Sequence, residues 1–123
     1  MSMSSAQLAR CLQDIQDERT ALIQELITAG PLLVGYVYDV MRKCGNPSCH
    51  CAHKPGHRQT LLIYSRNGRR SCKLVRRQEE QRIKQAWNNY RDFKKGIRRI
   101  RTLNRKELQI LGAKLKREAL RYK

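Results

Sequence analysis

The spacing of apolar residues changes twice along this chain of 123 residues, and these changes constrain its fold more than any other feature. Over residues 4–29, leucines and isoleucines recur at steps of three and four, as on one face of a helix. Residues 34–75 contain two-residue alternation rich in valine and tyrosine, which predicts strands. Residues 76–122 return to helical spacing without a proline, which predicts a long helix, either coiled-coil-like or bent into a helical hairpin at Gly96 or Gly112.

The first predicted helix has signals at both ends. Ser4 or Ser5 can cap its start, because a serine hydroxyl accepts a hydrogen bond from a free backbone N–H of the first turn. Gly30 and Pro31 can end it. Arg19 falls where the apolar stripe calls for a hydrophobic residue, so the stripe is imperfect.

The middle segment predicts a small sheet. Val34–Arg42 alternates as one strand, and Thr60–Val75 contains two strand-like runs around Asn67 and Gly68. Both turn residues tolerate positive φ, which suits a type I′ hairpin. The sequence therefore predicts an α+β fold: an N-terminal helix, a three-stranded antiparallel sheet and a long C-terminal helix.

Three cysteines and three histidines fall between Lys43 and His57, in the loop that joins the first strand to the hairpin. Cys44, Cys49, Cys51 and His57 have a spacing that lets one loop wrap a tetrahedral zinc ion. His53, His50 and Cys72 are alternatives to His57 as the fourth ligand. Four protein ligands leave no position for a substrate, so we expect the zinc to be structural. The sequence shows no secretory signal, so we expect metal ligation rather than disulfide bonds at these cysteines.

Charge is distributed unevenly. The chain has 27 Lys and Arg against 10 Asp and Glu, for a net charge of +17. Residues 1–33 carry −2, residues 34–75 carry +7 and residues 76–123 carry +12. Such a concentration of positive charge favours a polyanionic partner, with nucleic acid as the first candidate. The basic segment lacks the bulky apolar face and the lipidation motifs of a membrane anchor, so we expect no membrane partner.

The candidate nucleic-acid-binding residues lie in two groups, and arginine, which makes forked contacts with phosphate and guanine, is the commoner type. The first group is on the hairpin and just after it: Arg66, Arg69, Arg70, Lys73, Arg76 and Arg77. The second group is on the long helix: Lys94, Lys95, Arg98, Arg99, Arg101, Arg105 and Lys106. Four aromatic residues could stack on unpaired bases or simply pack in the fold: Tyr36, Tyr38, Tyr64 and Trp87.

The segments "GYVYDVMRKCGNPSCHCAHKPGH", "LLIYSRNGRRSCKLV" and "NNYRDFKKGIRRIRTLNRKEL" together resemble a bacterial family of short basic proteins with a Cys/His loop, encoded in mobile elements or plasmids near transposase or integrase genes. The resemblance covers residues 35–108, and the cysteine loop is its most specific part. It implies zinc binding at Cys44, Cys49, Cys51 and His57 and an accessory role in transposition or recombination.

The sequence therefore predicts a zinc-stabilised DNA-binding accessory or regulatory protein of a mobile-element transposase or recombinase. We expect it to be cytoplasmic, to associate with the nucleoid when bound to DNA, and to bind a recombinase or form a homodimer through its first helix. That helix could instead pack on the C-terminal helix. The alternatives are an RNA-binding protein and an adaptor that recruits an acidic protein. We expect no enzymatic activity, because the sequence contains no nucleophile with a visible base and no carboxylate cluster for metals.

Overall fold

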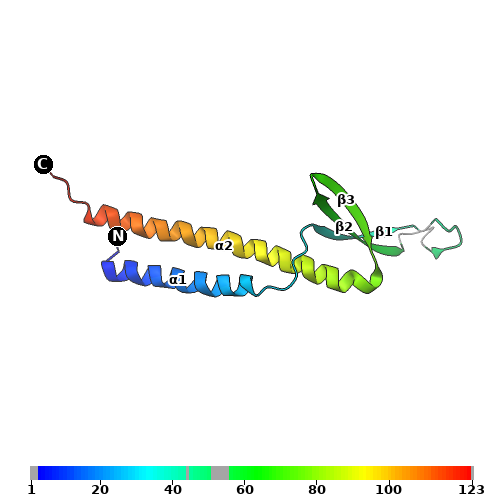
Figure 1. Cartoon of the computed structure of the whole chain (residues 1–123), viewed down its shortest axis with the longest axis horizontal. Helices are drawn as coiled ribbons and strands as arrows, with labels where there is room; N and C mark the ends of the chain where they lie inside the picture. The colour runs from blue at the N-terminus through cyan, green and yellow to red at the C-terminus, as the bar shows by residue number, and fades with distance from the viewer. Residues whose placement is uncertain (1–2, 44, 51–55, 123) are drawn as a thin grey trace. The chain divides into compact units, whose positions relative to one another are not determined.

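A computed structural model describes residues 3–43, 45–50 and 56–122 and confirms the α+β fold (Figure 1). The elements follow the predicted order: α1 (Ser5–Ile27), β1 (Tyr36–Arg42), β2 (His57–Arg66), β3 (Arg69–Val75), the 3-10 turn η2 (Arg77–Glu79) and α2 (Glu80–Glu118). The chain divides into two compact units, Met1–Ala29 with Asp92–Lys123 and Gly30–Arg91, so α2 contributes to both. Within the described part of the chain, no helix has the length and apolar character required to cross a membrane.

The start of α1 is fixed by a capping box. The Ser4 hydroxyl accepts a hydrogen bond from Gln7 N at 3.1 Å, and Ser4 N donates to Gln7 Oε1 at 2.7 Å. At the other end, the Thr28 hydroxyl donates to Gln24 O at 3.0 Å, and the helix ends at Ile27. Ser4, not Ser5, is therefore the cap, and the helix ends slightly ahead of the predicted glycine.

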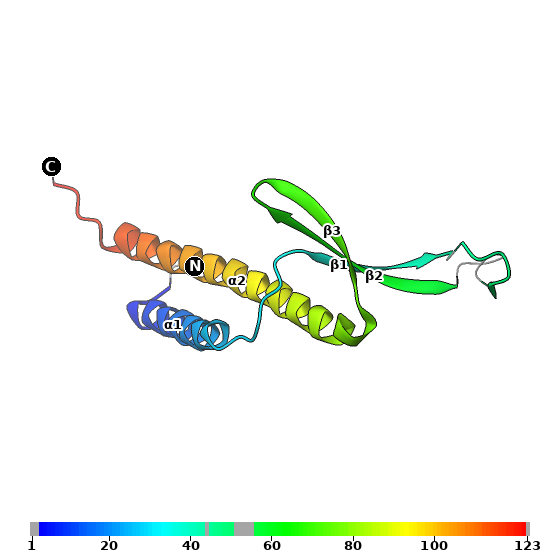
Figure 2. The same ribbon diagram turned by 45° about the vertical axis from the view of Figure 1, so that its right-hand side comes forward.

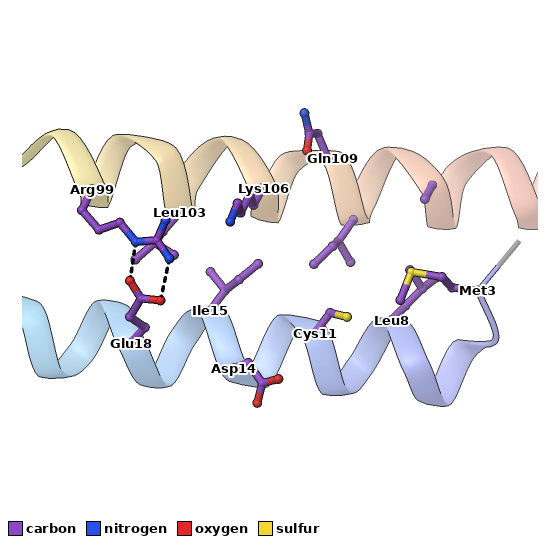
Figure 3. A pocket seen from close by; sticks show the side chains of 12 residues that line it. Met3, Leu8, Cys11, Asp14, Ile15, Glu18, Arg99, Leu103, Lys106 and Gln109 are labelled. Carbon is purple, nitrogen blue, oxygen red and sulfur yellow. Dashed lines mark hydrogen bonds and ion pairs between the residues drawn. The ribbon is translucent and has the colours of Figure 1, made fainter. Parts of the chain in front are cut away.

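In the first unit, α1 packs antiparallel on the second part of α2. Leu8 and Ile15 of α1 point toward α2, and Leu103 of α2, only 1% exposed, points back toward α1 (Figure 3). Further along, a Cβ atom at Gly96 would lie 2.7 Å from Leu26 Cδ2. Gly96 therefore allows close approach of the two helices, and α2 passes through it as one helix without the bend that a glycine could cause.

Polar contacts flank this helix pair. Arg99 donates to the two carboxylate oxygens of Glu18 at 2.5 and 2.8 Å (Figure 3). Arg19 donates to Glu107 and, at 2.7 Å, to Asn104 Oδ1. Arg19, which interrupts the apolar stripe in the sequence, thus has partners on α2. The Arg99–Glu18 pair is exposed and so contributes little to stability, whereas the Arg19–Glu107 pair is part-buried.

In the second unit, the sheet has the order β1-β2-β3 with both pairs antiparallel (Figure 2). Arg66 lies opposite Arg69 at the turn, where Asn67 has φ 54° and Gly68 has φ 76°. Positive φ at both central residues is the signature of the predicted type I′ turn.

One face of the sheet packs against the start of α2. The Asp39 carboxylate accepts hydrogen bonds from the Thr60 hydroxyl at 2.7 Å and from Lys84 Nζ at 3.0 Å. Arg58, on the same face by strand alternation, donates to Glu80 at 2.9 Å. Thr60 is fully buried (0% exposed). We call this face, which bears Asp39, Arg58 and Thr60, the inner face.

Truncation of Leu103 should destabilise the helix pair. We expect Leu103→Ala to lower the free energy of unfolding by about 2–5 kcal/mol, because it leaves a cavity where the side chain is fully buried. The matched control is Leu108→Ala on the same helix, whose side chain is 67% exposed; it should change stability by less than about 0.5 kcal/mol. Urea unfolding measures both, and equal losses would contradict the packing described for Leu103.

Candidate metal centre and nucleic-acid interface

The predicted metal loop leaves and re-enters the sheet at a single residue pair, Arg42 opposite His57. His57 Nε2 lies 3.1 Å from Cys49 Sγ. Two ligands of one tetrahedral zinc ion, a thiolate and an imidazole, would be about 3.6 Å apart. The fold thus brings two of the predicted ligands to within about half an ångström of the separation that a shared zinc ion needs.

A tight turn positions the Cys49 thiol. Gly45 has φ 85°, a conformation that glycine adopts without strain. The Asn46 side-chain oxygen accepts hydrogen bonds from the Ser48 N–H at 3.1 Å and the Ser48 hydroxyl at 2.8 Å. Cys49 N also donates to Asn46 O at 3.0 Å. Asn46 therefore acts as a local turn former, in keeping with its sequence context.

The remaining predicted ligands Cys44 and Cys51, together with the alternative ligand His53, lie outside the described residues. Among the residues that are described, no group of three or more Cys, His, Asp or Glu side chains is arranged to hold a metal ion. The described half of the site is therefore the Cys49 and His57 pair.

His50 and Cys72, the two described alternatives for the fourth zinc ligand, differ in how close they lie to Cys49. The His50 ring centroid lies 5.3 Å from that of His57, and its Nδ1 lies 3.8 Å from Cys49 Sγ. His50 is thus close enough to act as an alternative ligand. Cys72 lies opposite Ile63, six residues beyond His57 on β2, which is about 20 Å along the strand. Cys72 cannot share an ion with Cys49.

The hairpin concentrates positive charge at its tip. Arg66 and Arg69 are direct cross-strand partners, and like charges in such positions are destabilising. The Lys73 ammonium lies 5.8 Å from the centre of the Tyr64 ring. Within the described part of the chain, no acidic side chain forms an ion pair with any of the predicted residues of this group: Arg66, Arg69, Arg70, Lys73, Arg76 and Arg77.

The predicted nucleic-acid-binding residues of α2 differ in the side of the helix on which they lie. Arg99 is held by Glu18, and Lys106 lines the groove between α1 and α2, so both face α1 (Figure 3). The position of Lys95 in the helical turn places it on a flank of α2. Four exposed residues share the side opposite Leu103 and span about 17 Å of helix. We call these the α2 stripe: Lys94, Arg98, Arg101 and Arg105.

Two further basic residues were not among the predicted site residues. The Arg91 guanidinium lies over the Trp87 ring at 4.7 Å from its centre. This contact was visible as an i to i+4 spacing of an aromatic and a basic residue on a predicted helix. Arg42 ends β1 on the face of the sheet opposite Asp39, and only the strand register reveals that placement.

Two carboxylates of the inner face have perturbed acidities. The hydrogen bond from the Thr60 hydroxyl, followed by that from Lys84, lowers the pKa of Asp39 below its ordinary value of 3.8. The hydrogen bond from Arg58 lowers the pKa of Glu80 in the same direction. Both hydrogen bonds favour the ionised form of these carboxyl groups at the contact between the sheet and α2.

Residues 9–85, more than half of the chain, match the family described as "Domain of unknown function (DUF6788)". The matched segment includes all three strands and the loop between β1 and β2, and it ends before the α2 stripe. Comparison with curated proteins and comparison with solved structures gave no match.

The Asp39 contact should make stability fall in acid. A carboxyl group whose pKa is lowered by folding stabilises the protein above its unfolded pKa, and this contribution is lost as the pH falls through the folded pKa. We expect the melting temperature of the wild type to fall more steeply than that of Asp39→Asn as the pH is lowered from about 5, because the variant carries no titrating carboxyl there. Melting curves of both proteins measure this difference, and parallel pH profiles would contradict it.

Proposed function

The chain belongs to the DUF6788 family, whose function is unknown, and from its own residues we propose that it binds DNA through the β2–β3 hairpin and the α2 stripe. The observation that carries the proposal is the cross-strand pair of Arg66 and Arg69. Two guanidinium groups in directly opposed positions cost stability, and Arg70 follows immediately. A phosphate placed between such groups accepts forked hydrogen bonds and removes their repulsion.

The α2 stripe supports the same proposal independently. Its residues recur at steps of three and four, so their charges form one line along the helix. Duplex DNA carries one negative charge per about 1.7 Å of its axis, and a line of positive charge can follow its backbone. Such contacts position a protein on DNA without reading sequence. We therefore assign the stripe to backbone binding and the arginines of the hairpin to phosphate or guanine contacts.

We further propose that zinc is held by Cys44, Cys49, Cys51 and His57. The support is the 3.1 Å separation of Cys49 Sγ and His57 Nε2, together with two more thiols close by in sequence. When bound, the ion supplies folding energy and no reactive position, because all four ligands come from protein. His57 is the first residue of β2, so the site would brace the end of the β1–β2 pair.

The finer part of the proposal concerns a partner. The likeness of the cysteine loop, the hairpin and the helix to proteins encoded beside transposase and integrase genes supports an accessory role in transposition or recombination. In that role the chain would contribute DNA binding and the recombinase would contribute chemistry. Co-purification of a recombinase that persists after nuclease treatment tests this part.

Removal of the hairpin arginines should weaken DNA binding and its dependence on salt. For Arg66→Gln/Arg69→Gln, we expect the log–log salt slope on duplex DNA to become shallower by up to about 1.8, since each lost phosphate contact accounts for about 0.9. Fluorescence anisotropy with a labelled duplex at several salt concentrations measures the slope.

The control is Lys116→Gln/Arg121→Gln, which removes the same charge from exposed positions outside both groups. It should change the slope less than the hairpin variant does. An equal change in both variants would mean that net charge, not the hairpin, determines binding. The hairpin variant should also be at least as stable as wild type, because it removes a like-charge pair.

Loss of one thiol ligand should release zinc. We expect purified wild-type protein to contain zinc and Cys49→Ser to lose most of it, with reduced protection of sheet amides from hydrogen exchange, since the ion supplies folding energy. Cys72→Ser is the matched control because Cys72 is distant from the site along β2, and it should keep its zinc. Elemental analysis measures both, and equal zinc content in the three proteins would refute the site.

A further inference from the structure

The sheet has a second face, opposite the inner face. Side chains alternate between the two faces along a strand. Every second residue of β1, starting at Tyr36, therefore lies on this second face, as do the residues paired with them on β2 and β3. We call it the outer face: Tyr36, Tyr38, Val40, Arg42, His57, Gln59, Leu61, Ile63, Ser65, Arg70, Cys72 and Leu74. On this face Tyr36 is 57% exposed and Leu74 is 61% exposed, whereas Tyr38 is half-buried and Leu61 is buried, so the exposed aromatic surface is that of Tyr36.

The aromatic residues of this region form a continuous row. The ring centroids of Tyr38 and Tyr36 are 5.8 Å apart, and those of Tyr36 and Trp87 are 5.3 Å apart in an edge-to-face arrangement. Trp87 is fixed in place, because its indole N–H donates to Gly35 O at 2.8 Å. Fixed neighbours reduce the entropy that Tyr36 loses when a ligand stacks on it.

Positive charge surrounds the row. Arg91 lies over Trp87 at one end, Arg42 follows Tyr38 and Val40 along β1, and Arg70 lies on the outer face near the hairpin tip. No residue of the outer face is acidic, since Asp39, the sole carboxylate of the three strands, points to the inner face. In the described part of the chain, neither Arg42 nor Arg70 is in an ion pair.

We propose that the outer face binds unpaired nucleobases of a single nucleic-acid strand, with the exposed ring of Tyr36, supported by Tyr38, as the stacking platform and with Arg42, Arg70 and Arg91 as phosphate contacts. Exposed aromatic rings give a base a flat surface on which to stack, and every base has such a surface. The surrounding arginines can form ion pairs with the phosphate groups that link successive nucleotides. A duplex offers no base face to this surface, because its bases are stacked on one another.

This inference rests on the proposed function and adds a substrate class to it. The occupant is a strand with unpaired bases, as DNA or as RNA, and the chemistry of stacking is common to both. Only contacts with the 2′-hydroxyl distinguish RNA from DNA, so oligonucleotides of both kinds form separate arms of the test.

The test measures binding of wild type, Tyr36→Ala and Tyr36→Phe to a labelled dT oligonucleotide, an rU oligonucleotide and a duplex. We expect Tyr36→Ala to bind the single strands about 5-fold to 100-fold more weakly, the range associated with loss of one stacked base. Tyr36→Phe keeps the ring and should bind as wild type does. Duplex binding should be the same in all three proteins.

Tyr64→Ala is the matched control. Tyr64 is a neighbouring tyrosine that faces the opposite side of the sheet, and its loss should leave single-strand binding unchanged. If Tyr36→Ala binds single strands as wild type does while duplex binding persists, the stacking surface is wrong and the proposed function stands. If wild type binds no nucleic acid, both are wrong.

A second measurement uses the wild type alone, so it does not depend on the folding of a variant. Trp87 is the single tryptophan of the chain and contacts the Tyr36 ring. We expect saturation with the dT oligonucleotide to change tryptophan emission and saturation with the duplex to leave it unchanged. Equal changes with both ligands, or none with either, would overturn the assignment of the outer face.

Discussion

The Asp39 carboxylate joins the inner face of the small sheet to α2, beside the buried side chains of Val37, Thr60 and Val75. It is the sole acidic residue between residues 34 and 75, and it is held by the Thr60 hydroxyl and by Lys84 of α2. Because strands alternate, fixing Asp39 toward α2 directs Tyr36 and Tyr38 to the other side. The aromatic residues of the outer face thus follow from strand alternation once Val37 and Asp39 face α2.

Most of the fold could be predicted from apolar spacing and turn chemistry, because both are local properties. The two helices, the three strands and the type I′ turn at Asn67 and Gly68 all follow from neighbouring residues. Two features could not be foreseen, since each depends on a residue far along the chain. Gly96 does not bend α2, because it accommodates Leu26, and Arg19 is tolerated in the apolar stripe because Glu107 and Asn104 bind it.

Sequence spacing could propose the residues of the candidate site, and their arrangement depends on contacts that the spacing does not contain. Cys49 and His57 lie close together, as the spacing of a short loop leads one to expect, whereas zinc binding at these residues stays a prediction. The same spacing could not exclude Cys72, whose distance from the loop depends on strand register. Nor could it separate Arg99, which binds Glu18, from the exposed cations of the α2 stripe, because partners on α1 are needed to tell them apart.

Among the described residues, β3 lies at an edge of the sheet, where its backbone N–H and C=O groups on one side pair with no other described strand. Such edges can pair with a strand of another molecule and start aggregation, and charged side chains prevent this. Arg69, Arg70 and Lys73 give β3 that protection. A polyanion that neutralises these residues would also remove the charge that keeps two such edges apart.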